Sequence, residues 1–120
     1  MVSKMLRRML GIALFALANV TVAAHAGALV VDDAVATARF DRPIETTAYF
    51  SLVEALRRLQ PPIDVRLGLQ NGHLSLVVGG TATEVTTSTA WRDRLESLGG
   101  SAQWTRENGR AVVAISIPAE

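Results

Sequence analysis

The stretch DRPIETTAYFSLVEALRRLQPPIDVRLGLQNGHLSLVV, residues 41–78, changes the spacing of its apolar side chains part of the way along, and this change decides the fold class. In the first half they recur at helical spacing, at Ile44, Ala48, Leu52, Leu56 and Leu59. Asp41 can cap this helix, and Pro43 fits its first turn, where a proline forfeits no hydrogen bond. Pro61-Pro62 stops it, so the pattern predicts an amphipathic helix of about four turns.

Beyond the two prolines, apolar and polar side chains alternate, which is the period of a strand. The alternation runs over residues 63–69 and resumes over residues 74–78, on either side of Asn71-Gly72. Asn-Gly between two alternating runs is the strongest short hairpin signal, because both turn positions need a positive φ. Residues 63–78 are therefore predicted to form a β-hairpin.

The rest of the chain supplies three more strands and a second helix. ALVVDD, residues 28–33, is typical of a short buried strand. Residues 90–98 predict a helix with Gly99 as its stop, and its apolar face is formed by Trp91, Leu95 and Leu98. A second hairpin over residues 102–117 turns at Asn108-Gly109. Residues 79–89, rich in Gly and Thr with no apolar face, predict a loop.

The order β-α-β-β-α-β-β predicts a two-layer α/β sandwich, a mixed sheet with both helices on one face. The 120 residues allow one domain, and 49% hydrophobic against 19% charged residues suits a compact core. Because the chain has no cysteine, disulfides, thiol catalysis and thiolate metal sites are excluded. The net charge of +1 is spread along the chain, so we expect no nucleic-acid partner.

The first 26 residues form an apolar leader that admits three interpretations. Three basic residues precede an uncharged run over residues 9–22, and Ala24-His25-Ala26 has the small residues of a signal-peptidase site. A cleaved signal would leave residues 27–120 as an exported domain. A retained leader could contact a membrane through residues 5–24, or form an apolar helix over residues 9–24 that packs on the domain or is vestigial. The compartment depends on this choice: exported or membrane-associated with a functional leader, and cytoplasmic otherwise.

The residues and their order also resemble one protein family. RPIETTAYFSLVEAL (42–56) before a hairpin, RDRLESLGG (92–100) before a second hairpin and a terminal ISIP (115–118) are similar to the ATP-binding catalytic domain of bacterial sensor histidine kinases. This is the HATPase-type domain of GHKL proteins, and the chain resembles especially the subfamily paired with LuxR-type response regulators. The resemblance spans residues 28–119. It implies a Bergerat-like fold, two-component signalling, and a sensor kinase, a response regulator or a second copy as partner.

The resemblance also implies where a nucleotide site would lie. In that family the first helix carries a Glu that orients or activates water or the attacking group, and this chain has Glu54 there. Four residues on, where the family has an Asn that helps to hold Mg²⁺, this chain has Arg58. The family's Asp that accepts a hydrogen bond from the adenine amino group aligns with Gly80. Where the family has a glycine-rich lid, this chain has TTSTAW, residues 86–91.

These departures predict the fold without the kinase activity. Loss of a charge-assisted hydrogen bond to adenine costs about 1.5–3 kcal/mol, and the lost Asn also weakens the hold on Mg²⁺. At tenfold per about 1.4 kcal/mol, such losses together weaken nucleotide binding by orders of magnitude. We therefore interpret the chain as a degenerate ATPase-like domain, a regulatory or interaction module with no enzymatic activity and no cofactor. Glu54 would be the relic of the general base.

Two alternatives stay open at this point. One is a small exported or membrane-tethered α/β binding protein. The other is an active sensor-kinase fragment in which Glu54, Arg58, Gly79 and Gly80 rebuild a site for ATP and Mg²⁺. The sequence shows no other catalytic or metal-binding motif: the histidines at positions 25 and 73 are far apart in the sequence, and no serine stands in a nucleophile elbow. Both tryptophans are predicted to be core residues.

Overall fold

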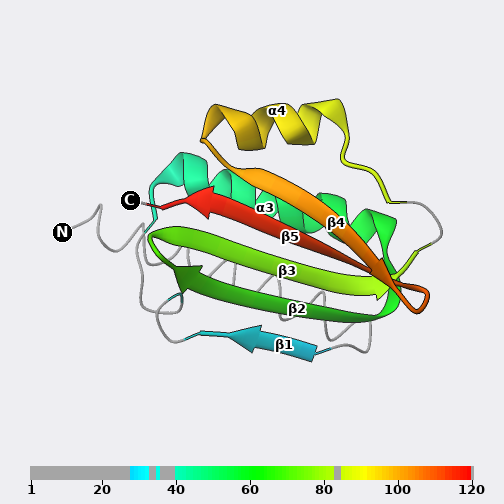
Figure 1. Ribbon diagram of the computed structural model, residues 1–120. Coiled ribbons are helices and arrows are strands. Elements are labelled where there is room, and N and C mark those ends of the chain that lie inside the picture. Colours follow the sequence, from blue (N-terminus) through cyan, green and yellow to red (C-terminus); the bar gives the residue numbers. More distant parts are fainter. Residues whose placement is uncertain (1–27, 33–34, 36–39, 83–84, 120) are drawn as a thin grey trace.

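The computed structural model describes residues 28–32, 35, 40–82 and 85–119 of the chain. Within these ranges, strands and helices follow one another in the predicted order, and Figure 1 shows a sheet with helices α3 and α4 on one side. The strand order across the sheet is β1-β2-β3-β5-β4. β1 runs parallel to β2, and the other neighbouring strands are antiparallel. The predicted two-layer α/β sandwich with a mixed sheet is confirmed.

The elements have the following bounds: β1 Ala28–Val31, α3 Arg42–Arg58, β2 Gln60–Gln70, β3 His73–Thr81, α4 Thr89–Ser97, β4 Ser101–Glu107 and β5 Arg110–Pro118. The leader, with its expected boundary after Ala26 and its apolar helix over residues 9–24, lies outside the described residues. In the part of the chain that is described, no helix combines the length and the apolar character needed to cross a membrane.

Both hairpins turn where the sequence places them. Asn71 and Gly72 have φ values of 52° and 75°, and Asn108 and Gly109 have φ values of 53° and 79°. Two successive residues with positive φ are the requirement of the type I′ turn, whose twist matches that of the flanking strands. The two Asn-Gly pairs thereby fix the register of β2 with β3 and of β4 with β5.

The core lies between the two layers. The sheet contributes the alternate side chains of β2, β3 and β5, all buried: Ile63, Val65, Leu67, Leu74, Leu76, Val78, Val113, Ile115 and Ile117. The helices contribute the buried residues Ile44, Ala48, Leu52, Ala55, Trp91 and Leu95. Because each fully buried Leu or Ile is worth about 1.5–3 kcal/mol relative to exposure, this interface is the main source of stability.

The beginning of α3 differs in one detail from the expectation. Asp41 occupies the N-cap position, and its backbone carbonyl accepts hydrogen bonds from the amides of Ile44 and Glu45 at 3.0 and 3.1 Å. The side chain of Asp41 makes no capping hydrogen bond, so the backbone rather than the carboxylate closes the first turn. Pro43 lies in that turn, as predicted.

The prediction of a loop over residues 79–89 is wrong for its first three residues and for Thr89, the first residue of α4. Gly79, Gly80 and Thr81 continue β3, paired with Val112, Ala111 and Arg110 of β5. Glycines have no apolar side chain, so an alternating pattern cannot reveal a strand that ends in them. β2 likewise begins at Gln60, before the alternating pattern starts at Ile63, and so includes Pro61 and Pro62. The two prolines fit in the strand because they lie at a register shift between Gln60 and Asp64, where the pairing with β3 does not need their missing N–H groups.

Candidate functional site

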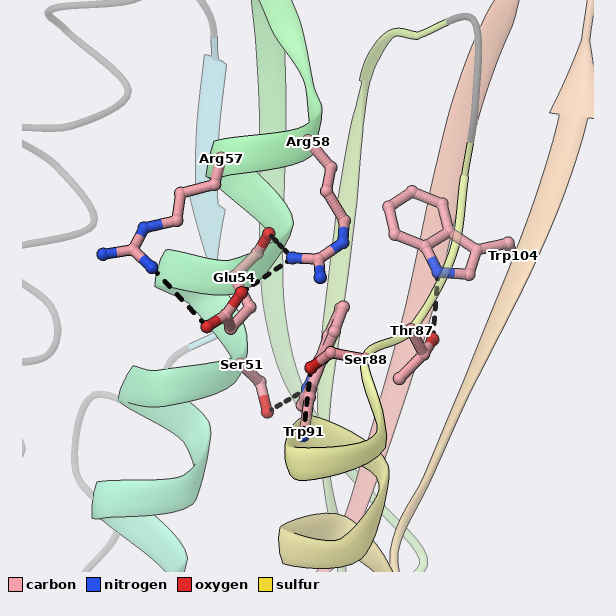
Figure 2. A network of polar contacts seen from close by, with 8 residues as sticks. All are labelled: Ser51, Glu54, Arg57, Arg58, Thr87, Ser88, Trp91 and Trp104. Atoms are coloured by element: carbon pink, nitrogen blue, oxygen red, sulfur yellow. Dashed lines mark hydrogen bonds and ion pairs between the residues drawn. The ribbon is translucent and has the colours of Figure 1, made fainter.

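The expected site residues Glu54 and Arg58 lie one turn apart on α3, and Figure 2 shows them joined. Arg58 Nη1 donates to Glu54 Oε2 at 2.7 Å and to the Glu54 carbonyl oxygen at 2.8 Å. On the other side, Arg57 Nη1 lies 3.7 Å from Glu54 Oε1. The Glu54 side chain is only 14% exposed and that of Arg58 21%, so the pair is partly shielded from water. Each carboxylate oxygen of Glu54 therefore faces a cation of its own helix.

Arg58 has a second neighbour, the indole ring of Trp91 on α4. The guanidinium carbon lies 5.3 Å from the ring centroid, within the range of a cation–π contact. Trp91 is fully buried, and its Nε1 donates to the hydroxyl of Ser51 at 2.9 Å. Ser51 lies one turn before Glu54 on α3. The ion pair is thus backed by a tryptophan that is itself fixed to the same helix.

The network extends to β4 and to the segment that precedes α4. Trp104 of β4 meets Trp91 edge-on, with ring centroids 6.3 Å apart and an interplanar angle of 89°. Its Nε1 donates to Thr87 Oγ1 at 3.1 Å, and Ser88 Oγ caps α4 by accepting from the Trp91 amide at 3.2 Å. We call this group the Trp91 cluster; its members are Ser51, Glu54, Arg58, Thr87, Ser88, Trp91 and Trp104 (Figure 2). It joins α3, α4 and β4 through side chains alone.

The two glycines of the expected site face opposite sides of the sheet. Gly80 points toward the helices, where an added Cβ would lie 3.0 Å from both the Leu59 Cβ and the Gln60 carbonyl oxygen. Gly79 points to the opposite face, where a Cβ would lie 3.4 Å from Arg110 Nη2 and from Val112 Cγ2. The structure therefore brings Glu54 and Arg58 together and places Gly80 just beyond them, against the end of α3. Gly79, its neighbour in β3, faces the other side of the sheet.

The residues present do not fit the Mg²⁺ that the resemblance implies. Mg²⁺ is held by oxygen ligands, chiefly carboxylates, in near-octahedral geometry. The Glu54 carboxylate is engaged by two guanidinium groups. Among the described residues, no three acidic, histidine or cysteine side chains gather in a group that could hold a metal ion. His73 is exposed, and its Nδ1 lies 3.2 Å from Ser116 Oγ.

The sequence points to Glu54 and Arg58 but not to the Trp91 cluster as a whole. Trp91 is predicted as a core residue and is one, whereas Trp104 is only half-buried. The bond from Trp91 to Ser51 joins positions 40 residues apart, and the bond from Trp104 to Thr87 spans 17. A serine inside an amphipathic helix carries no local sign of such a partner, so only the packing of α4 on α3 reveals it.

No protein-family model matches the chain, and no curated protein matches it. Solved structures do. The histidine kinase domain of the blue-light activated histidine kinase of Erythrobacter litoralis is 18% identical with a TM-score of 0.65, over 92% of this chain and 65% of that chain. Acinetobacter baumannii histidine kinase AdeS is 11% identical with a TM-score of 0.61, over 93% of this chain and 64% of that chain.

A third similar structure is the catalytic domain of histidine kinase ThkA in a nucleotide-free form, 11% identical with a TM-score of 0.60 over 92% of both chains. The chain therefore spans nearly all of an isolated catalytic domain, but less than two thirds of the first two structures. The likeness at these identities is one of fold. Together with the sheet order and the two helices, it shows that the chain has the α/β-sandwich fold of histidine kinase catalytic domains.

Proposed function

We propose that this chain is a degenerate histidine-kinase ATPase-like domain, a regulatory or interaction module of two-component signalling that does not transfer phosphoryl groups. The observation that carries the proposal is the ion pair of Arg58 with Glu54 at 2.7 Å. It stands where the resembled family has a catalytic Glu followed, four residues on, by a metal-holding Asn.

The ion pair opposes both roles that the family gives to this turn of the helix. A general base must present an oxygen that the reacting proton can reach. Glu54 Oε2 accepts a hydrogen bond from Arg58 and Oε1 lies 3.7 Å from Arg57, so both oxygens of this carboxylate already face a cation. A divalent cation would also have to approach a carboxylate beside a fixed positive charge, and at an effective dielectric constant near 20 two like charges about 4 Å apart repel by several kcal/mol. Arg58 could attract phosphate, but Glu54 neutralises its charge and Trp91 covers one side of it.

Gly80 gives independent support. The family's adenine-binding Asp aligns with this position, where even a methyl group would crowd the Leu59 Cβ and the Gln60 carbonyl oxygen at 3.0 Å. A carboxylate that continued from that Cβ would enter the buried contact between the end of α3 and β3. The closeness of the two backbones favours glycine here for packing. We infer that the adenine contact has been given up together with the metal site.

ATP turnover tests the proposal. The full chain, incubated with ATP and Mg²⁺ in a coupled assay for ADP release, is expected to show the same background rate as its Glu54→Gln and Arg58→Asn variants. Glu54→Gln keeps the shape of the side chain and removes its basicity, so it measures any catalysis that depends on the carboxylate. Turnover by the natural chain that disappears in Glu54→Gln would overturn the proposal and favour the active-fragment alternative.

A further inference from the structure

A groove lies at the end of the helical layer farthest from the Trp91 cluster, between the first turn of α3 and the last turn of α4. Figure 1 shows these two helix ends on the same side of the molecule, near the C-terminus. The groove has a volume of about 370 Å³, and its walls include Arg42, Pro43 and Thr46 from α3 and Arg94, Ser97 and Leu98 at the end of α4. The groove is shallow and open to solvent, so it can receive side chains of a partner rather than enclose a small ligand.

The charge of the groove is one-sided. Two arginines line it, one from each helix, and none of its lining residues is acidic. The ion pairs found among the described residues involve Arg57, Arg58 and Arg110, but neither Arg42 nor Arg94. A guanidinium has five N–H donors, and donors without an acceptor in the protein are left for water or for a bound anion. Two such groups facing one hollow favour an anionic occupant.

Arg94 is also held in place. Its guanidinium carbon lies 4.2 Å from the centroid of the Phe50 ring, a close cation–π contact. Stacking on a ring fixes the plane of the guanidinium, so less side-chain entropy is lost when a carboxylate binds its two parallel N–H groups. Arg58 also lies over a ring, but its Nη1 is bonded to the carboxylate and the carbonyl oxygen of Glu54. An anion can therefore approach the N–H donors of Arg94 without competing with a carboxylate such as the one that binds Arg58.

The remaining walls favour a peptide over a bare ion. Pro43 and the half-buried Leu98 line the same groove as the two arginines and offer it apolar surface, and the groove is open to solvent. An inorganic anion would use only the charges, whereas a peptide with an acidic and an aliphatic side chain would use both. We propose that this groove is a docking site for an acidic, Leu-containing segment of a partner protein. This site would be the place where the proposed interaction module binds its partner. The proposal rests on the proposed function only for the inference that the occupant is a protein.

A peptide titration followed by NMR tests the site. The probe is a capped hexapeptide of alternating Glu and Leu, and its control has Gln at every Glu position. We expect the acidic peptide to bind the full chain with a Kd of about 1 mM or below, which is ordinary for two charge-assisted contacts on an open surface. The shifted signals should be the backbone amides of residues 44–47 and 94–98 and the side-chain Nε–H of Arg94.

The matched variants are Arg42→Gln/Arg94→Gln and Arg66→Gln. The first should weaken binding of the acidic peptide by about tenfold or more, because it removes two charge-assisted hydrogen-bonding groups. Arg66→Gln alters the charge of an exposed side chain of β2 and should leave the affinity unchanged. Arg94→Lys keeps the charge but not the two-pronged geometry and should fall between them. A thermal melt of each variant shows that it is folded.

Four results would each overturn the docking site: no shift with the acidic peptide, equal binding of the Gln peptide, unchanged affinity in Arg42→Gln/Arg94→Gln, or shifts that map elsewhere. Inorganic phosphate is the last arm. If it shifts the same signals with the affinity of the peptide, the groove is a simple anion site and the peptide proposal is wrong. Neither arginine touches Glu54 or Arg58, so the ATP-turnover assay and this titration can fail separately.

Discussion

Replacement of Trp91 by alanine is expected to lower the free energy of unfolding by about 3–5 kcal/mol, the range for large aromatic side chains removed from a core. Trp91 is fully buried, and the change would leave a cavity between α3, α4 and β4. It would also strip the buried Ser51 hydroxyl of its donor and Arg58 of its aromatic neighbour. Since a domain of this size has only about 5–15 kcal/mol of stability, the variant should lose a large share of it.

Urea denaturation followed by far-ultraviolet circular dichroism measures this loss without relying on tryptophan fluorescence. The matched control is Tyr49→Ala, which removes an aromatic side chain from the same helical layer where it is 47% exposed. Its effect should stay within about 0.5 kcal/mol, as for most surface substitutions. If the two variants had the same urea midpoint, Trp91 would not be the centre of the cluster that joins the two helices.

The second large effect is expected from a single added methyl group at Gly100. This residue links α4 to β4, and its amide donates to the Leu95 carbonyl oxygen at 2.8 Å. A Cβ at this position would lie 2.6 Å from the Ser116 carbonyl oxygen and 3.3 Å from the Leu95 carbonyl oxygen. Both atoms are backbone, so β5 or the end of α4 must move. We expect Gly100→Ala to cost about 1–3 kcal/mol, as overpacked positions do.

Gly79→Ala is the control for this substitution. The nearest atoms to a Cβ there are side-chain atoms of Arg110 and Val112, at 3.4 Å, and the Ala111 carbonyl oxygen is at an ordinary contact distance of 3.8 Å. β3 also has an extended backbone that alanine accepts. Reduced freedom of the unfolded chain can then stabilise the protein by about 0.4–1 kcal/mol. Thermal melts of the two variants should move in opposite directions. A melting temperature of Gly100→Ala at or above that of the natural chain would contradict the close approach of α4 and β5.

The parts of the fold that are local in sequence could be predicted. The Asn-Gly pairs set both hairpin turns, and the switch from helical to alternating spacing after Leu59 separates α3 from β2. The end of β3 could not be predicted, because Gly79 and Gly80 owe their strand conformation to pairing with β5, a segment about 30 residues away in the sequence. Pairing between distant segments leaves no periodic trace in residues that lack side chains.

In the candidate site, too, the contacts within one helix could be predicted from the sequence and the contacts between helices could not. Glu54 and Arg58 are four residues apart on one helix, so their contact follows from helical geometry once the helix is predicted. The cover over Arg58 comes from Trp91 of α4, and the two arginines of the groove come from positions 42 and 94. These arrangements depend on how the second helix packs on the first, which the sequence leaves open. The docking groove was therefore not foreseen, whereas the ion pair was within reach of the sequence.

Calorimetric titration of the full chain with ATP in the presence of Mg²⁺ measures whether this domain binds a nucleotide. With Arg58 bound to Glu54 and a Cβ at Gly80 crowded by Leu59 and Gln60, we predict no saturable heat up to about millimolar nucleotide, with a trace that matches that of Glu54→Ala. Saturable binding with a Kd of about micromolar that Glu54→Ala abolishes would contradict the account, because the carboxylate would then serve the nucleotide rather than Arg58.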